Sequence, residues 1–297
     1  MKRCKKQTPI AMLLMFGFLL VGGSGMVSAN SDVTLPGVSI QLWSVKEDLN
    51  KDFDGTLIKL ADLGFAGVEF AGDFGHYADN PKALKQTMDN LGLKGSGAHV
   101  SFEQLNAQNL EKTVAFYQAL DVNYLIIGWD ERAWDSQRID EVVQLLNQAA
   151  KQLKQFGLQV GFHNHDHEFN DYQGGTFWDY IATNTDASVI LQQDVGWTTY
   201  AGKDPVDYVK RYPGRTQTTH YKVLAQDKYP DLIPLIGNGE TDWPALVQAN
   251  IKVGDTHWLV VEQEETPKGM TRMQAVEKSL YALNQYLSIY LNQSSIK

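Results

Sequence analysis

Three of the chain's seven histidines lie within five residues, at positions 163, 165 and 167. They directly follow a short apolar run over residues 158–162 that is typical of a buried strand. Since successive strand residues point to opposite faces, we expect His163 and His165 to share a face. Two imidazoles side by side at a strand end could bind a metal ion or transfer a proton. A polar loop is the alternative interpretation, but similar residue types recur at later strand ends, and this favours a site.

Two carboxylates occur in segments that are otherwise apolar. Asp194 lies between residues 189–191 and 195–197, and Glu262 directly follows the apolar residues 258–261. A buried ionised carboxylate is costly unless a metal, a cation or hydrogen bonds compensate it. Capping of a neighbouring backbone group would explain either acid alone. Because His220 lies between the two acids in chain order, we favour a shared metal site.

The predicted metal ligands are His163, Asp194, His220 and Glu262, and His165 is the alternative to His163. Mixed oxygen and imidazole ligands suit one divalent ion such as Mn²⁺, Co²⁺, Mg²⁺, Fe²⁺ or Zn²⁺, and the sequence does not choose between them. A mixed site that leaves water positions open is typical of catalysis rather than of a structural metal.

Further polar residues lie where strands are expected to end. Glu69 could contact a substrate or pair with a neighbouring loop, and His99 could contact a substrate or pack in the core. Lys222 could pair with a carboxylate, bind a substrate oxygen or take part in catalysis.

Aromatic residues also follow several of these strands. Aromatic rings at the mouth of a site stack well on the C–H faces of sugar rings, although core packing is the commoner role of a tryptophan. Several tryptophans at one rim favour a small carbohydrate as the substrate. The predicted substrate-binding residues are Glu69, His99, Trp43, Trp197 and Glu168.

The elements that position these residues recur along the chain. Eight short apolar runs alternate with segments of helical period, and no long linker divides them. This order predicts a single α/β domain over residues 30–297, a (β/α)₈ TIM barrel, in which catalytic groups sit at the carboxyl ends of the strands. A doubly wound sheet is the alternative, but no glycine-rich phosphate loop follows the first strand. The expected strands are residues 38–43, 67–70, 95–100, 124–128, 159–165, 189–194, 218–222 and 258–262.

Residues 1–29 have the pattern of a secretory signal peptide. A basic start precedes an apolar run over residues 10–21, and small residues at 27–29 fit a cleavage site. The apolar run is short for a retained membrane anchor, so we expect an exported protein, periplasmic or secreted. Cleavage would remove the only cysteine, Cys4, and would therefore leave no thiolate ligand.

The net charge of −9 becomes more negative by four when the basic start is lost. An acidic surface disfavours nucleic acid and anionic lipid as partners. It also favours a neutral sugar over a phosphorylated one. The sequence leaves the oligomeric state open, and a homo-oligomer is possible because the C-terminal helix could pack on its own barrel or on a partner.

Taken together, these motifs resemble the sugar isomerase/epimerase superfamily with the xylose isomerase-like TIM barrel. The resemblance covers nearly all of residues 30–297 and implies a divalent metal held by Asp194, His220, Glu262 and a residue on the fifth strand. Many sugar epimerases of the superfamily carry glutamate at that fourth position, where this chain offers His163. The matching segments are residues 41–44, 67–70, 161–169, 193–197, 220–222, 236–243 and 258–263.

The resemblance implies proton abstraction next to a carbonyl, with Glu262 or a strand-five histidine, His163 or His165, as the base. We expect a metal-dependent isomerase or epimerase of a neutral sugar. The alternative is a lyase or hydrolase of 3-keto-glycosides, because a branch of the superfamily with a similar His-Asn-His segment resembles such enzymes. A sugar-binding protein without turnover is a second alternative. The apurinic endonucleases of the superfamily are excluded by the acidic charge and the few histidines.

Overall fold

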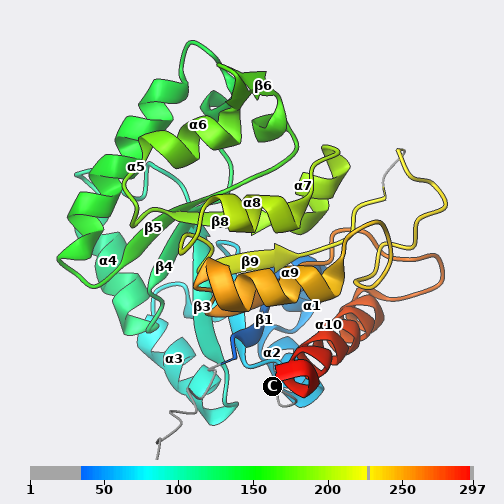
Figure 1. The fold of residues 1–297 in the computed structure, drawn as a ribbon. Coiled ribbons are helices and arrows are strands. Elements are labelled where there is room, and N and C mark those ends of the chain that lie inside the picture. Colours follow the sequence, from blue (N-terminus) through cyan, green and yellow to red (C-terminus); the bar gives the residue numbers. More distant parts are fainter. Residues whose placement is uncertain (1–34, 226–227, 295–297) are drawn as a thin grey trace, which may run out of the picture. The chain divides into compact units, whose positions relative to one another are not determined.

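The computed structural model describes residues 35–225 and 228–294, and the predicted signal peptide, residues 1–29, lies outside them. Residues 35–297 form one compact unit built around a closed barrel of eight parallel strands (Figure 1). The order around the barrel is β1-β10-β9-β8-β5-β4-β3-β2, and it confirms the predicted (β/α)₈ fold. The barrel strands are β1 (Gly37–Gln41), β2 (Gly67–Phe70), β3 (Lys94–Val100), β4 (Tyr124–Ile127), β5 (Gln159–His163), β8 (Ile190–Asp194), β9 (Thr218–Tyr221) and β10 (Trp258–Val261).

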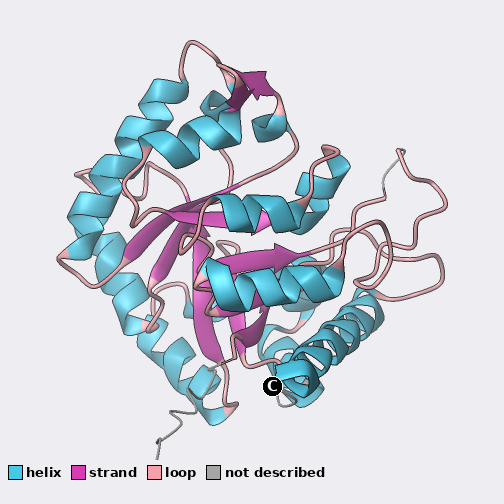
Figure 2. Cartoon of the chain, viewed as in Figure 1, coloured by secondary structure: helices cyan, strands magenta, loops and turns pink. Residues whose placement is uncertain are grey.

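Helices cover the outside of the strands (Figure 2). Gly64 ends α2 at a φ of 100°, a conformation that suits glycine. The α-helices are α1 (Lys46–Lys51), α2 (Phe53–Leu63), α3 (Pro81–Asn90), α4 (Leu110–Ala119), α5 (Ile139–Lys154), α6 (Phe177–Asn184), α7 (Val195–Tyr200), α8 (Pro205–Arg211), α9 (Trp243–Ala249) and α10 (Arg272–Ser294).

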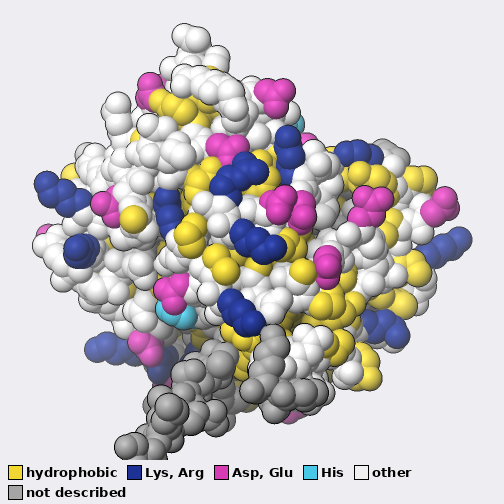
Figure 3. Space-filling view, in the orientation of Figure 1, with side chains coloured by type: hydrophobic (Ala, Val, Ile, Leu, Met, Phe, Trp, Pro, Cys, Tyr) yellow, Lys and Arg dark blue, Asp and Glu magenta, His cyan; other side chains and the backbone are white. Residues whose placement is uncertain are grey.

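The C-terminal helix α10 packs on its own barrel, against α9 and β10. It buries Leu280, Leu283 and Leu287. No helix in the described part of the chain is long and apolar enough to cross a membrane. On the face shown in Figure 3, lysine and arginine side chains are scattered among acidic ones and do not gather in one patch.

Several expected strands are shorter than the sequence pattern suggested. β1 ends at Gln41, so that Trp43 lies in the 3₁₀ turn η1 (Leu42–Val45). β5 ends at His163, and His165 lies in the loop that follows. Lys222 and Glu262 each come directly after a strand rather than closing it. These residues therefore occupy the loops at the carboxyl ends of the strands, where a barrel places its active site.

The ends of β5 and β8 are held together by Asn164. Its Oδ1 accepts a hydrogen bond of 2.9 Å from the Asp194 backbone amide. Its Nδ2 donates to the carbonyls of Asp194 and His165, at 3.3 Å each. Asn164 and Asp194 are both fully buried, so the Asp194 backbone groups have no access to water as an alternative partner.

We expect Asn164→Ala to lower the free energy of unfolding by about 2 kcal/mol, because the buried Asp194 amide loses its partner. Urea unfolding of the metal-free protein measures this loss. Asn90→Ala is the matched control, since Asn90 is exposed at the end of α3, and a change of no more than about 0.5 kcal/mol is expected there. Equal stability of the two variants would contradict the role of Asn164.

Candidate metal centre and active site

The four predicted metal ligands meet at one end of the barrel. Parallel strands bring their carboxyl ends to the same rim, and potential ligand atoms of His163, Asp194, His220 and Glu262 all lie within 4.8 Å of one another. His220 Nδ1 is 2.9 Å from Glu262 Oε2 and 3.9 Å from Asp194 Oδ2. His163 Nε2 is 3.7 Å from Asp194 Oδ2. The structure thus brings together residues that are far apart in the sequence.

Two imidazole nitrogens and two carboxylate oxygens at this spacing fit one divalent ion. All four residues are buried, so an ion there would be shielded from bulk water. The donor set is mixed and hard, and it suits several divalent metals without choosing between them. His99, His163 and His220 form an overlapping group. The Nε2 of His99, the member outside the first set, is hydrogen-bonded to Gln192.

Gln192 determines how two of the histidines are oriented. Its Oε1 lies 3.0 Å from His163 Nδ1 and 2.8 Å from His99 Nε2, while its Nε2 donates to Glu69 Oε2 at 2.7 Å. The amide oxygen can only accept, so both imidazoles donate an N–H to it. His163 Nε2 is therefore left with its lone pair facing Asp194, as a metal ligand requires.

Glu69 has the same effect on His220. Its Oε1 accepts hydrogen bonds from His220 Nε2 at 2.5 Å and from Gln41 Nε2 at 2.7 Å, which leaves His220 Nδ1 directed at Glu262. Glu69 is fully buried and does not belong to the described residues that line the cavity. In this structure the Glu69 carboxylate contacts His220 and Gln41 and orients a candidate metal ligand, and its contact with substrate stays a prediction.

Lys222 provides positive charge to the carboxylates. Its Nζ lies 2.7 Å from Asp194 Oδ2 and 2.9 Å from oxygens of both Glu262 and Glu264. Burial by itself would lower the pKa of Lys222, but the carboxylates of Asp194 and Glu262 outweigh it and raise that pKa. The amine is therefore an ammonium ion, which acts as an electrostatic partner and is unsuited to nucleophilic attack.

Burial and neighbouring charges also shift the pKa values of the candidate ligands His220, Glu262 and Asp194. Burial would lower the pKa of His220, but Glu69 and Glu262 raise it to about 10. Burial would raise the pKa of Glu262, but Lys222 and His220 hold it well below its usual range. Burial raises the pKa of Asp194 despite the attraction of Lys222. An anionic Glu262 and a cationic His220 are thus in direct contact.

A cavity of about 580 Å³ opens above these ligands. Its wall includes His163 and Glu262 of the ligand set, together with the predicted residues Trp43, His99 and His165. Trp43 is 46% exposed, and Trp129, another residue of the wall, is 57% exposed. Such a volume accommodates a small ligand, and two exposed indoles at its mouth suit the faces of a sugar ring.

His165 differs from the ligand histidines in its surroundings. Burial and the nearby Lys222 ammonium lower the pKa of His165 to about 3, so the imidazole is neutral. Its ring packs edge-on against Trp129 at 4.6 Å, and its Nδ1 has no hydrogen-bond partner among the described residues. His165 is therefore a neutral imidazole on the wall of the cavity.

Two predicted substrate contacts lie behind the wall of the cavity. Glu168 is fully buried, and its Oε2 accepts a hydrogen bond from the His165 amide at 2.9 Å. Burial raises the pKa of Glu168 to about 8, so its carboxyl is mostly protonated at neutral pH. Trp197 packs against His165, with ring centroids 5.4 Å apart. Both residues support His165 and are not among the described residues that line the cavity.

Sequence reasoning missed three residues of the centre. Gln192 and Asn164 are uncharged amides, and nothing in their types distinguishes them from ordinary polar residues. Glu264 lines the cavity two residues after Glu262 and binds Lys222. The pair Glu262 and Glu264, on alternate positions after a strand, was the one available signal.

The protein is thus a (β/α)₈ barrel whose strand ends bring two imidazoles and two carboxylates around one point that could hold a divalent ion. Residues 57–286 match the family described as xylose isomerase-like TIM barrel, and the chain belongs to this family.

Individual relatives and solved structures are similar to this chain over most of its length. An inosose dehydratase of Mesomycoplasma hyopneumoniae is 24% identical over 292 residues, covering 85% of this chain and 96% of that protein. A sugar phosphate isomerase/epimerase structure from Parabacteroides distasonis ATCC 8503 superposes with a TM-score of 0.70 at 23% identity, covering 84% of this chain and 96% of that one. The structure of the IOLI protein with a bound zinc atom superposes with a TM-score of 0.63 at 14% identity, covering 86% of this chain and 99% of that one.

Asp194 has two functions that substitution can separate. Its Oδ1 caps α7 by accepting from the Trp197 amide at 2.9 Å, while its Oδ2 faces the ligand set. We expect Asp194→Asn and Asp194→Ala both to lower Mn²⁺ affinity by more than about 100-fold, beyond the usual effect of an outer partner. Only alanine should also cost about 1 kcal/mol of stability in the metal-free protein, since asparagine caps equally well. Calorimetric titration and urea unfolding measure the two effects, and unchanged Mn²⁺ binding would contradict the ligand assignment.

Metal binding should depend on pH because a proton and a metal compete for the same His220 lone pair. With the pKa of His220 raised to about 10, the metal-free ring is protonated at neutral pH and must lose its proton to become a ligand. Apparent Mn²⁺ affinity should therefore increase between pH 6 and pH 9, by roughly tenfold per unit for each proton released. Calorimetric Mn²⁺ titrations in buffers of different ionisation enthalpy measure the number of protons released on binding. A pH-independent affinity with no proton release would show that His220 is not a ligand.

Proposed function

We propose that the protein is a metal-dependent lyase that removes a proton next to a ketone and expels an oxygen substituent from the neighbouring carbon. A 3-keto-glycoside is the proposed substrate, with the proton at C2 and the leaving group at C1. The observation that carries the proposal is His165, a neutral imidazole that lines the cavity beside the candidate metal ligands His163 and Glu262. Relatives named inosose dehydratase support elimination over isomerisation.

The carboxylate alternative for the base is less suited to proton removal. Glu262 Oε2 accepts hydrogen bonds from both His220 and Lys222, so this oxygen is already paired with two nitrogen donors. The fifth strand provides His163 instead of a second carboxylate, and Gln192 directs that imidazole at the ligand set. A symmetrical exchange between two carboxylates therefore has no counterpart here.

The proposed reaction needs one base. His165 takes the C2 proton, and the C–H electron pair forms the carbon–carbon double bond of the enolate. The C1–O bond then breaks as the carbonyl reforms, and the proton held by His165 passes to the leaving oxygen. The products are an unsaturated ketone and an alcohol, so atoms and charge balance. A divalent ion held by the four ligands would supply a positive charge that favours negative charge on the substrate oxygen.

The position of the rim residues supports a neutral, hydroxylated substrate. Trp43 and Trp129 present exposed indole faces, and Glu264 adds a negative charge at the wall. Carboxylates accept hydrogen bonds from hydroxyl groups and repel phosphate. Export is part of the proposal, since residues 1–29 have the pattern of a secretory signal and glycosides are first met outside the cytoplasm.

The test is a ¹H NMR time course in D₂O. The protein is loaded with Mg²⁺ rather than Mn²⁺, because paramagnetic Mn²⁺ would broaden the lines. Methyl 3-keto-glucoside and free ketoses are supplied in separate samples. We expect release of methanol from the glycoside. His165→Gln should reduce kcat by about 10²- to 10⁴-fold while metal affinity is kept, as expected for loss of a general base.

His167→Gln is the matched control, because His167 is exposed, lies two positions further along the same segment and does not line the cavity. Its rate should equal that of the parent. Deuterium incorporation into a ketose, with a new isomer and no methanol, would establish the isomerase or epimerase instead. Sugar binding without either reaction, in the metal-loaded protein, would establish a binding protein.

A further inference from the structure

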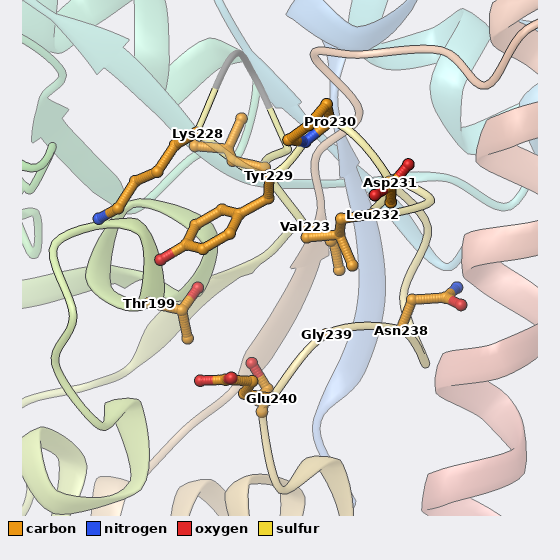
Figure 4. Close-up of a pocket in the computed structure, with 12 residues that line it drawn as sticks. Thr199, Val223, Lys228, Tyr229, Pro230, Asp231, Leu232, Asn238, Gly239 and Glu240 are labelled. Atoms are coloured by element: carbon orange, nitrogen blue, oxygen red, sulfur yellow. The ribbon is translucent and has the colours of Figure 1, made fainter.

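A second cavity of about 400 Å³ opens in the loops that follow β9 and precede α9. We call it the loop groove. Its wall includes Thr199 at the end of α7, Val223 and Tyr229 after β9, and Glu240 before α9. In Figure 4 the Tyr229 ring points toward Thr199, and Glu240 lies on the loop that leads to α9. Residues 236–243 belong to this region, and the proposed reaction assigns them no role.

The loop groove begins next to the metal centre. Val223 directly follows Lys222, so its Cα lies about 3.8 Å further along the chain. Thr199 comes five residues after Asp194, which corresponds to about 8 Å along α7 at 1.5 Å per residue. Two separate segments therefore lead directly from residues of the metal centre to the wall of the loop groove.

Aromatic rings connect the two cavities. Trp129 of the metal-centre cavity contacts His165 at 4.6 Å, and His165 contacts Trp197 at 5.4 Å between ring centroids. Trp197 contacts Tyr200 at 5.7 Å, and Tyr200 contacts Tyr229 of the loop groove at 6.2 Å. The series is unbroken, and its members come from four separate segments of the chain.

The chemistry of the loop groove suits a hydroxylated ring. Tyr229, Leu232 and Val223 provide apolar contact surface. The carboxylates of Asp231 and Glu240 have no ion pair or hydrogen bond to other described residues, and they can accept from hydroxyl groups. A ring with an apolar face and hydroxyls at its edge matches both features.

Lys228 does not make the loop groove an anion site. Its Nζ donates to the Tyr200 carbonyl and lies over the rings of Tyr200 and Tyr229, at 4.8 and 5.2 Å. The two carboxylates at the wall would repel a phosphate or carboxylate ligand. A neutral ring compound is therefore the class of ligand that the wall recognises.

We propose that the loop groove is a second subsite that binds the leaving group of the substrate, a six-membered ring carrying hydroxyl groups. The inference rests on the proposed lyase function and makes its substrate a glycoside with a ring at C1 rather than a free sugar. That ring is either a second sugar or a phenol, because both present an apolar face and hydroxyls. A volume of about 400 Å³ falls in the range of small-molecule sites.

Binding tests the subsite without turnover. Saturation-transfer NMR compares methyl β-glucoside, hydroxyphenyl β-glucoside and cellobiose, none of which carries a ketone. We expect saturation of the aglycone ring protons in the last two, and Tyr229→Ala should weaken their binding about tenfold. Tyr281→Ala is the matched control, since Tyr281 is 67% exposed on α10, and it should leave binding unchanged. Saturation of the phenol alone or of the second sugar alone identifies the source of the ring.

Turnover separates the two proposals. With 3-keto-glucosides of methanol, a hydroxyphenol and glucose, the ratio of kcat/KM for the ring-bearing substrates to that for the methyl glucoside should fall about tenfold in Tyr229→Ala. Ring saturation without any elimination would leave the subsite standing and overturn the lyase. Elimination at equal kcat/KM for all three substrates, with no ring saturation, would leave the lyase standing and overturn the subsite.

Discussion

An ionised carboxylate at the centre of a barrel is stable only when cations and N–H donors surround it. Glu69, Asp194 and Glu262 are all buried at the carboxyl end of this barrel. His220 lies between Glu69 and Glu262, and Lys222 bridges Asp194 and Glu262. The other polar residues of the centre are arranged around this alternation of negative and positive charge, and a bound divalent ion would extend it.

The arrangement of charges around the buried carboxylates gives the histidines different protonation states. His220 is enclosed by carboxylates and carries a proton, whereas His165 faces Lys222 and is neutral. His163 and His99 both donate to Gln192, so one amide oxygen fixes two tautomers. One residue type is thus cationic at His220 and neutral at His165, because its environment rather than its identity sets its protonation.

Much of this molecule was predictable from the sequence because local patterns carry the information. Eight apolar runs between helical segments predicted the barrel, since each strand must bury both faces. Asp194 and Glu262 were recognisable as candidate ligands because a buried acid in an apolar run needs a compensating cation or hydrogen bonds. The shorter ends of β1 and β5 were not predictable, since the polar residues that follow them alternate as a strand would.

The sequence by itself determined the barrel, its family resemblance and the residues that could hold a metal, because burial cost and side-chain periodicity act within a few positions. Only the tertiary structure decided that Glu69 orients His220, a contact between residues 151 positions apart, and that Gln192 connects His99, His163 and Glu69. It also placed Glu168 and Trp197 behind His165 and opened the loop groove beside α7. Hydrogen bonds and cavities depend on which strands become neighbours, and that choice follows from closing the whole sheet into a barrel.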